Sequence, residues 1–448
     1  MRNFCHGVLM LMLVSLGMAA LVPAARAVPG YSRQTGLSCA ACHTIYPALT
    51  PFGRQFKLNG YTMTNLMQVV AKETGETPAM SLNRDMTVSA IAQIGLTNLS
   101  RAVPGQQNPN VAAPQDLSLY LAGEATPHVG TFIQLSYAQD SGKVALSMAD
   151  VRYANHADWG GTDTVYGITF NTAPTIEDVW NSTPAEGYPF VASASAPTPA
   201  AGPFIASMNV ADNVLGVGGY AKRGNWYGVA TLYRAAPQGQ SIGTRDMAIR
   251  GSAPYLRLAW SHDTATQSLE FGVLGLRADY SPMGASPLTD RYTDLGADSQ
   301  YQYFAPDGVD ILELRGSYIR ENTDWSATPA SNASDVTRFL AVNGSWIHAR
   351  RYGLTLGYFQ TAGTADCLIY NGNASCSGIA TAVSGSQTGS PNSSGYIIEF
   401  DYLPWQNLKF ATQYTLYSKF NGATSNYDGN GRNAAYNNTL FLDVMLAF

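Results

Sequence analysis

The segment Leu440–Phe448, which reads L-F-L-D-V-M-L-A-F, decides the fold class because its apolar side chains recur at every second residue. Successive side chains of a β-strand point to opposite faces, so a period of two indicates an extended chain. One face is entirely apolar and consists of Leu440, Leu442, Val444, Leu446 and Phe448. The opposite face carries Asp443. The segment therefore predicts a strand that lies between lipid and a polar lumen.

The same alternation recurs in about sixteen segments, an even number, as bacterial β-barrels require. These segments begin near residues 85, 115, 129, 144, 162, 211, 225, 250, 266, 298, 309, 336, 352, 394, 408 and 436. On nearly every one of them, one face is free of charge. In one segment, Arg257 and Ser261 alternate with Leu256, Leu258 and Trp260. In a second, Glu313 and Arg315 alternate with Leu312, Leu314 and Tyr318. In a third, Arg277 and Asp279 alternate with Leu274, Leu276, Ala278 and Tyr280.

The charged faces are expected to line the lumen. The residues concerned are Glu124, Asp150, Arg152, Arg257, Arg277, Asp279, Glu313, Arg315, Glu399, Asp401, Lys409 and Asp443. Such charges could line a channel or hold a plug, but a generic solvated lumen is the favoured interpretation. A soluble β-sandwich or propeller is the alternative fold, and it would not tolerate charge-free faces on nearly every strand.

Connections between the segments alternate in length. Short ones include 126–128, 223–225, 307–308 and 403–407, whereas long ones fall near 98–114, 171–210, 236–249, 281–297, 321–335, 362–393 and 419–435. Short turns of outer-membrane barrels lie on the periplasmic side and long loops lie outside. We therefore expect the beginning and the end of the barrel on the periplasmic side. A last strand that stops on an aromatic residue also resembles the assembly signal of such barrels.

Composition agrees with this fold class. Charged residues make up only 13% of the 448 residues, against about 25% in soluble proteins. The mean hydropathy of -0.08 is too low for a helical membrane protein and typical of a barrel with one polar face. The net charge of -5 gives no indication of nucleic-acid binding.

The N-terminus has the features of an export signal. Arg2 is followed by the apolar run Val8–Val22 and by the small residues around Arg26. We expect residues 1–27 to be a signal peptide, and an uncleaved anchor is the less favoured alternative because the run is short for a spanning helix. The remaining chain would divide into a short segment, 28–83, and an outer-membrane barrel, 84–448.

The short segment contains C-x-x-C-H, the attachment signature of a c-type haem, at Cys39, Cys42 and His43. Two thiols at this spacing can reach the two vinyl groups of one porphyrin, and the following histidine can ligate the iron. A redox-active thiol pair and half of a zinc site are the alternatives. The overall prediction is an all-β transmembrane antiparallel barrel of about 16 strands with a short N-terminal c-type haem segment.

Two further features concern sulfur-containing residues. The sixth haem ligand cannot be identified, and the low-ranking candidates are Met63, Met67, Met80 and Met86, which could equally be packing residues. Cys367 and Cys376 lie in a polar stretch that we expect to be a surface loop. Because export places them in an oxidising compartment, a local disulfide is expected there.

The sequence 31–43, YSRQTGLSCAACH, followed by PALTPFGRQFKLNGY at 47–61, resembles the N-terminus of the fused outer-membrane cytochrome–porin family. The best-known members of that family are monohaem c-type cytochrome iron oxidases of iron-oxidising bacteria. The resemblance covers about thirty residues, and beyond them only the architecture agrees. It implies one covalent haem c held by Cys39, Cys42 and His43.

The resemblance also implies partners. Fe(II) would be the extracellular electron donor, a periplasmic c-type cytochrome or copper protein the acceptor, and outer-membrane lipid the surroundings. The leading hypothesis is therefore an outer-membrane cytochrome that oxidises Fe(II). A conduit for another donor or acceptor, and a porin in which the haem segment is only a plug, are the alternatives.

Overall fold

The computed structural model describes residues 30–63, 68–72, 78–83, 88–138, 142–184, 187–207, 210, 214–235, 248–282 and 288–448. The predicted signal peptide, 1–27, lies outside the described residues, as do Met67 and Met86. No helix among the described residues is long and apolar enough to cross a membrane.

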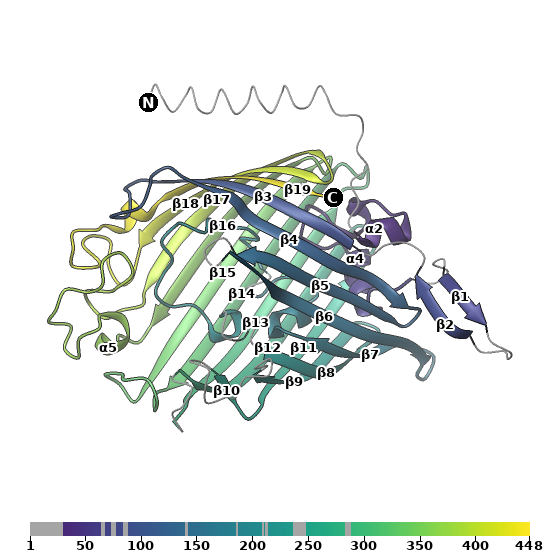
Figure 1. The fold of residues 1–448 in the computed structure, drawn as a ribbon, viewed down its shortest axis with the longest axis horizontal. Coiled ribbons are helices and arrows are strands. Elements are labelled where there is room, and N and C mark those ends of the chain that lie inside the picture. The colour runs from purple at the N-terminus through teal and green to yellow at the C-terminus, as the bar shows by residue number, and fades with distance from the viewer. Residues whose placement is uncertain are drawn as a thin grey trace.

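The described strands form a closed antiparallel barrel of sixteen strands (Figure 1). Each strand pairs with its neighbours in sequence, and the barrel closes where β19 pairs with β3, from Thr439 opposite Leu99 to Ala447 opposite Ile91. A short extra strand, β10 (Ala248–Arg250), pairs with β12 beyond the end of β11. The sixteen strands are β3 Val88–Leu99, β4 Asn110–Thr126, β5 Val129–Ala138, β6 Lys143–Asp158, β7 Asp163–Asn171, β8 Val214–Arg223, β9 Trp226–Ala235, β11 Ala253–Asp263, β12 Gln267–Ser281, β13 Asp290–Phe304, β14 Asp310–Asp324, β15 Ser334–His348, β16 Tyr352–Gly363, β17 Ser393–Trp405, β18 Leu408–Lys419 and β19 Thr439–Ala447.

The outer face of the barrel is apolar, as predicted. Leu256, Leu314 and Leu356 are 60%, 57% and 56% exposed, whereas Arg257 and Glu313 beside them point inward and are buried. The terminal strand follows the same rule, since Leu446 is exposed and Asp443 is buried. A closed sheet satisfies all its backbone hydrogen bonds internally, and an apolar exterior needs lipid around it. The chain is therefore an outer-membrane β-barrel protein.

One predicted strand orientation is wrong. On β12, Leu274, Leu276, Ala278 and Tyr280 face the lumen and are buried. Arg277 points outward, and Asp279 forms an ion pair with Arg291 that is 38–45% exposed. The lumen is filled with apolar residues at this level, so the inward face is the apolar one. The outward charges lie near the end of the strand that carries the long loops.

Several strands extend into ranges that were predicted to be loops. β4 begins at Asn110 and β13 at Asp290, ahead of the predicted starts near 115 and 298. β13 and β14 stay paired as far as Arg291 opposite Asp324, where both strands are polar. Backbone pairing does not depend on lipid contact, so the alternation of apolar residues stops before the strands do.

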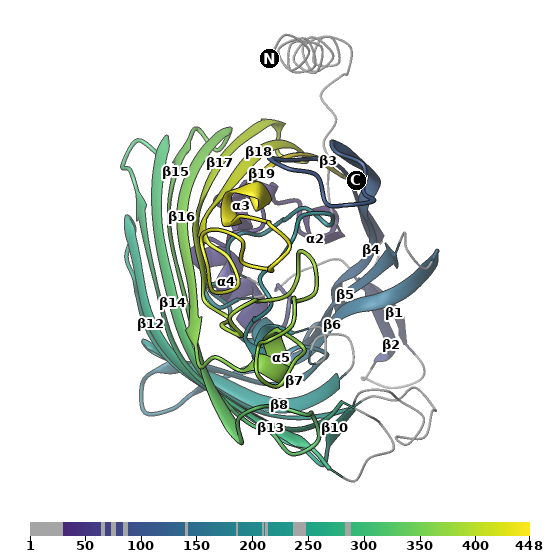
Figure 2. The same ribbon diagram turned by 90° about the vertical axis from the view of Figure 1, so that its left-hand side faces the viewer.

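In the described part of the chain, three short helices precede the barrel: α2 (Gly30–Thr35), α3 (Cys39–Cys42) and α4 (Pro51–Leu58). They lie inside the outline of the barrel, at the end with the short turns and the C-terminus (Figures 1 and 2). We call residues 30–63 the N-terminal plug. A two-stranded sheet of β1 (Gln68–Lys72) and β2 (Pro78–Asn83), which the sequence analysis did not predict, follows it outside the barrel.

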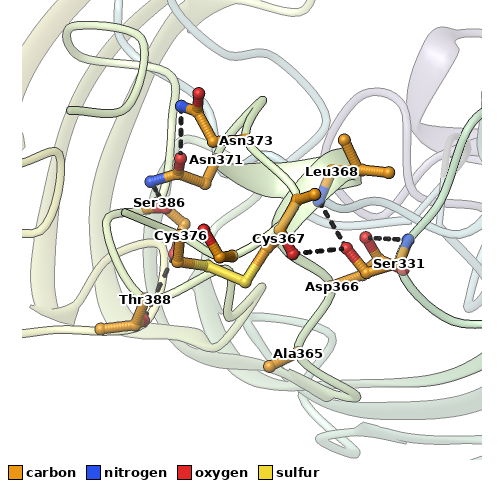
Figure 3. Close-up of a disulfide and its surroundings, with 12 residues drawn as sticks. Ser331, Ala365, Asp366, Cys367, Leu368, Asn371, Asn373, Cys376, Ser386 and Thr388 are labelled. Atoms are coloured by element: carbon orange, nitrogen blue, oxygen red, sulfur yellow. Dashed lines mark hydrogen bonds between the residues drawn. A yellow bond between two sulfur atoms is a disulfide. The ribbon is translucent and has the colours of Figure 1, made fainter. Parts of the chain in front are cut away.

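The loops at the opposite end contain α5 (Cys367–Tyr370) and the 3-10 helix η4 (Ala434–Asn437). Cys367 and Cys376 are joined by a disulfide, which confirms the predicted pairing (Figure 3). Asp366, beside Cys367, accepts hydrogen bonds from the backbone amides of Ser331 and Asn332 and so ties two loops together.

Candidate functional site: a C-x-x-C-H turn in a barrel plug

The C-x-x-C-H sequence forms a single helical turn, α3, that begins at Cys39 and ends at Cys42. Residues three apart on a helix lie on the same face, so both thiols are presented on one side of the turn. The two cysteines are free thiols and are partly exposed. His43 follows at once, and its backbone N–H donates to the carbonyl of Cys39 at 2.8 Å. The three predicted haem residues are therefore brought together in one turn.

The imidazole of His43 is oriented by a hydrogen bond from Nδ1 to the carbonyl oxygen of Pro47 (3.1 Å). A carbonyl can only accept, so Nδ1 carries the proton and Nε2 keeps a free lone pair. Burial lowers the pKa of His43 below its usual value, which favours the neutral ring. A neutral imidazole with one nitrogen held by a backbone carbonyl has the form that an iron ligand requires.

The thiols are not set up as a redox pair. Burial raises the pKa of Cys39, and burial together with the neighbouring Cys39 raises the pKa of Cys42 to about 11. Reactive cysteines have lowered pKa values and lie in electropositive surroundings. The zinc alternative also lacks support, because no group of three or more His, Cys, Asp or Glu side chains among the described residues could hold a metal. Covalent attachment to a porphyrin stays the prediction for these two residues.

Helix α4 supports the turn from behind. Thr50 caps this helix, since its side chain accepts from the backbone N–H of Gly53 at 3.1 Å and donates to the carbonyl of Ala41 at 2.7 Å. Gly53 is needed because a Cβ atom there would lie 2.3 Å from the carbonyl oxygen of Cys42. Thr50 and Gly53, within the stretch 47–61, thus have structural roles that the sequence analysis did not identify.

Arg54, one residue later, fixes the plug to the barrel wall. The residue as a whole is 3% exposed. It donates to the side-chain oxygens of Gln300 (2.9 Å), Gln302 (2.8 Å) and Ser268 (2.6 Å), and it lies 3.4 Å from Asp263. These partners lie on and next to β12 and β13, more than 200 residues away in sequence. Sequence reasoning missed this role because nothing local marks the partners.

Other contacts attach the plug all around the barrel. On one side, Gln34 exchanges hydrogen bonds with the backbone of Glu124 on β4, and Tyr61 donates to Asp150 on β6 at 2.6 Å. On the other side, Arg350 in the β15–β16 turn donates to the carbonyls of Ala40 and His43. Because these contacts come from opposite sides of the barrel, the C-x-x-C-H turn is held inside it, at the end with the short turns (Figure 1).

An apolar cluster lies on the wall beside the turn. It consists of Ile91, Tyr120, Ala122, Met445 and Ala447, with Tyr31, Tyr46 and Phe132 packed against it. The ring of Tyr46 lies 5.2 Å from that of His43. Tyr46 therefore connects the turn to this apolar part of the wall.

The methionine candidates for the sixth ligand stay open. Met63 is partly buried, and its backbone N–H donates to Glu124 at 3.1 Å. Met80 belongs to β2, outside the barrel, and its side chain is not among the described ones. Met67 and Met86 lie outside the described residues, so the structure selects none of the four.

Part of the long connection between β7 and β8 folds into the lumen, whereas the sequence analysis placed it outside. We call its described residues, 172–184 and 187–207, the inner loop. Glu177, Asp178, Val179 and Trp180 are at most 2% exposed, and the 3-10 helices η1 (Pro174–Glu177) and η2 (Phe204–Ala206) belong to this loop. The apolar residues around Glu177 and Asp178 were the available sequence signal for an inward position.

Two buried arginines of the barrel hold the inner loop. Arg152 forms ion pairs with Asp150 (2.6 Å) and with Glu177 of the loop (3.0 Å). Arg257 pairs with Asp178 of the loop (3.1 Å) and with Asp298 of the wall (2.7 Å). The side chains of all these residues are fully buried. The favoured prediction of a generic solvated lumen is therefore wrong at this level, because these charges hold the inner loop in place.

Comparisons with known proteins add little beyond the fold. No family model and no curated protein matches the chain. Among solved structures, OmpF of Salmonella typhi in complex with daunomycin is 12% identical, with a TM-score of 0.47 over 81% of this chain and 97% of that one. OmpT of Vibrio cholerae is 9% identical (TM-score 0.46, 85% and 100%), and the channel DcaP of Acinetobacter baumannii is 14% identical (0.46, 81% and 97%). The strand pairing and the apolar outer face carry the conclusion that the chain is an outer-membrane barrel with a C-x-x-C-H plug.

Proposed function

We propose that the protein is an outer-membrane c-type cytochrome that accepts electrons from extracellular Fe(II) and passes them to a periplasmic c-type cytochrome or copper protein. The observation that carries this proposal is the position of the Cys39–His43 turn, which lies inside the barrel at the end with the short turns, the end expected to face the periplasm (Figure 2). Its sequence surroundings resemble those of the cytochrome–porin family of iron oxidases. The proposal needs one covalent haem c, which would supply a one-electron redox couple.

Each residue of the turn and of its surroundings would have its own role in holding the haem. Cys39 and Cys42 would each form a thioether bond, and His43 would ligate iron through Nε2 while Pro47 fixes the ring. Thr50, Gly53 and Arg54 would hold the turn in place, as described above. The thiols of Cys39 and Cys42 are only partly buried, and a soluble electron acceptor would approach the turn from the end of the barrel that holds the plug.

The alternative of a porin with a haem-bearing plug shares the support of the porin-like barrel itself. The plug lies in one mouth of the barrel, and two buried ion-pair clusters hold the inner loop inside the lumen (Figure 2). Electrons do not need an open channel, so a lumen narrowed by the plug and the inner loop is compatible with a conduit, whereas solute conductance in planar bilayers would favour the porin. A conduit for another donor or acceptor has the same structural support, and only the redox chemistry separates it from iron oxidation.

The test is a redox titration of the purified full-length protein. Fe(II) at the growth pH of the organism should reduce the haem signal to the same end point as dithionite. Reduction by dithionite without reduction by Fe(II) would refute iron oxidation and leave the other conduit. His43→Ala should abolish the redox signal while the protein still folds as a barrel, and Thr44→Ala, next to it in the plug, is the matched control.

A further inference from the structure

Three arginines lie on the lipid-facing surface of the barrel, toward the end with the long loops. They are Arg277 on β12, Arg320 on β14 and Arg338 on β15, and all three are exposed. The chain neighbours of Arg320, Ile319 and Glu321, face the lumen and are 1% and 6% exposed. Strand pairing places Arg320 directly opposite Arg338. Because residues opposite each other on adjacent strands have Cβ atoms about 4.5–5.5 Å apart, these two guanidinium groups share one patch of the surface.

The arginine pair lies at the border of the apolar band. On β14, the outward residues that precede Arg320 include Leu314 and Tyr318, which are 57% and 40% exposed. The outward residues that follow it are the polar Asn322 and Asp324. An aromatic residue at the edge of an apolar band is typical of the membrane–water interface. The arginines therefore lie at the depth of the lipid head groups, in the leaflet on the side of the long loops, which is expected to be the outer one.

The protein itself does not balance this positive charge. None of the three guanidinium groups has an ion pair or hydrogen bond with any residue that the structure describes. The nearby carboxylates serve another arginine, because Arg291 on β13 pairs with Asp279 at 2.8 Å and lies opposite Asp324. Like charges directly opposite each other destabilise a sheet, and an anion between them would remove this repulsion. The unpaired arginines thus indicate that an anion from the surroundings belongs there.

The polar and apolar residues around the pair match the two parts of a lipid. One step farther out, Arg277, Thr293 and Asn322 form a row across three paired strands and add hydrogen-bond donors. Two strand spacings and two residues along the strand separate Arg277 from Arg320, which amounts to roughly 12 Å between Cα atoms. On the apolar side, Leu295 lies opposite Arg320 and is 60% exposed. The patch therefore offers two positive positions above a surface that suits acyl chains.

We propose that Arg320 and Arg338 bind a phosphate group of lipid A, the phosphorylated glycolipid of the outer leaflet, and that Arg277 meets its second phosphate. A guanidinium group binds phosphate through two parallel hydrogen bonds, and basic clusters at head-group depth attract anionic lipids. Lipid A is a disaccharide with a phosphate at each end and acyl chains below, so it matches two separated positive positions above an apolar surface. The inference does not depend on the proposed function, because it concerns only the lipid-facing side of the barrel.

The binding test is native mass spectrometry of the purified full-length protein in detergent, titrated with diphosphoryl lipid A. We expect one saturable site in the wild type and about tenfold weaker binding in Arg320→Gln, because a charge-assisted contact to phosphate is lost. Arg234→Gln is the charge-matched control and should bind as the wild type does. Arg234 is exposed and points outward at the corresponding end of β9, but it lies opposite Leu215 rather than a second arginine. Lipid A without phosphate groups should bind the wild type only weakly.

Three results would overturn the site: no saturable binding in the wild type, equal dissociation constants for the wild type and Arg320→Gln, or equally tight binding of lipid A with and without its phosphates. Displacement of lipid A by an equal concentration of inorganic phosphate would show that the free anion is the ligand and would overturn the lipid assignment. If Arg320→Gln does not fold, Arg338→Gln decides in the same way, because it removes the other charge of the pair. Haem reduction by Fe(II) is measured separately, so the lipid site and the proposed function can fail independently.

Discussion

Replacing Arg54 by methionine should loosen the plug without disturbing the barrel. The substitution keeps the buried stem of the side chain and removes the hydrogen bonds to Gln300, Gln302 and Ser268. Hydrogen bonds from a charged group contribute about 1.5–3 kcal/mol each. Asp263 is 32% exposed, so solvent screening makes its contribution small.

Three bonds at the lower limit would give about 4–5 kcal/mol, and water entering from the periplasmic mouth would recover part of that. We therefore expect the free energy of docking the plug in the barrel to become about 3–4 kcal/mol less favourable. This corresponds to a population shift of about two to three orders of magnitude.

Hydrogen exchange of the α4 amides, followed by mass spectrometry, measures this shift directly. The exchange rate of the amides in residues 51–58 should rise by about two to three orders of magnitude in Arg54→Met. The exchange rates in the barrel strands should stay the same. Arg291→Met is the control, since it removes an exposed ion pair with Asp279 far from the plug. Unchanged α4 exchange in Arg54→Met would refute the role assigned to Arg54.

Three further predictions concern the lumen and the outer loops. Arg257→Met should destabilise the docked inner loop by about 3–5 kcal/mol, because Asp178 and Asp298 would lose their counter-charge; conductance in planar bilayers should rise, and a conductance as low as that of the wild type would contradict the clamp. Burial raises the pKa of Asp366, but backbone hydrogen bonds from Ser331, Ile369 and Asn332 outweigh burial and hold the pKa below its usual value. The contribution of Asp366 to loop stability should then be complete above the usual aspartate pKa and be lost only as the pH falls through the lowered pKa of Asp366. Hydrogen exchange of the Ser331 amide would follow this loss. A loss already near the usual aspartate pKa would argue against the role assigned to Asp366. Reducing the Cys367–Cys376 disulfide should cost the loop about 2–3 kcal/mol of chain entropy, visible as faster proteolysis there, with barrel melting unchanged.

Much of the barrel could be predicted from the sequence, because lipid outside and polar groups inside impose a period of two on each strand. The orientation of β12 could not be predicted in this way. Alternation shows that two faces differ, but it does not say which face meets lipid. Where the inner loop fills the lumen with apolar residues, Leu276 and Tyr280 point inward and the usual assignment reverses.

The candidate site was predictable only where its chemistry is local. Cys39, Cys42 and His43 are adjacent in sequence, and their spacing alone indicates haem attachment. The anchors are different, because Arg54 meets Gln300 and Gln302 only after the barrel has closed. The clamp of the inner loop depends on Arg257 meeting Asp178 and Asp298, which come from different strands and a loop. No local pattern marks such partners.

Mass spectrometry of the native protein tests the central claim most directly. After proteolysis, the peptide that contains Cys39 and Cys42 should carry the added mass of one haem, and no other peptide should carry it. An unmodified peptide from fully processed native protein would contradict covalent haem attachment, and with it the proposed electron transfer, while leaving the plugged outer-membrane barrel intact.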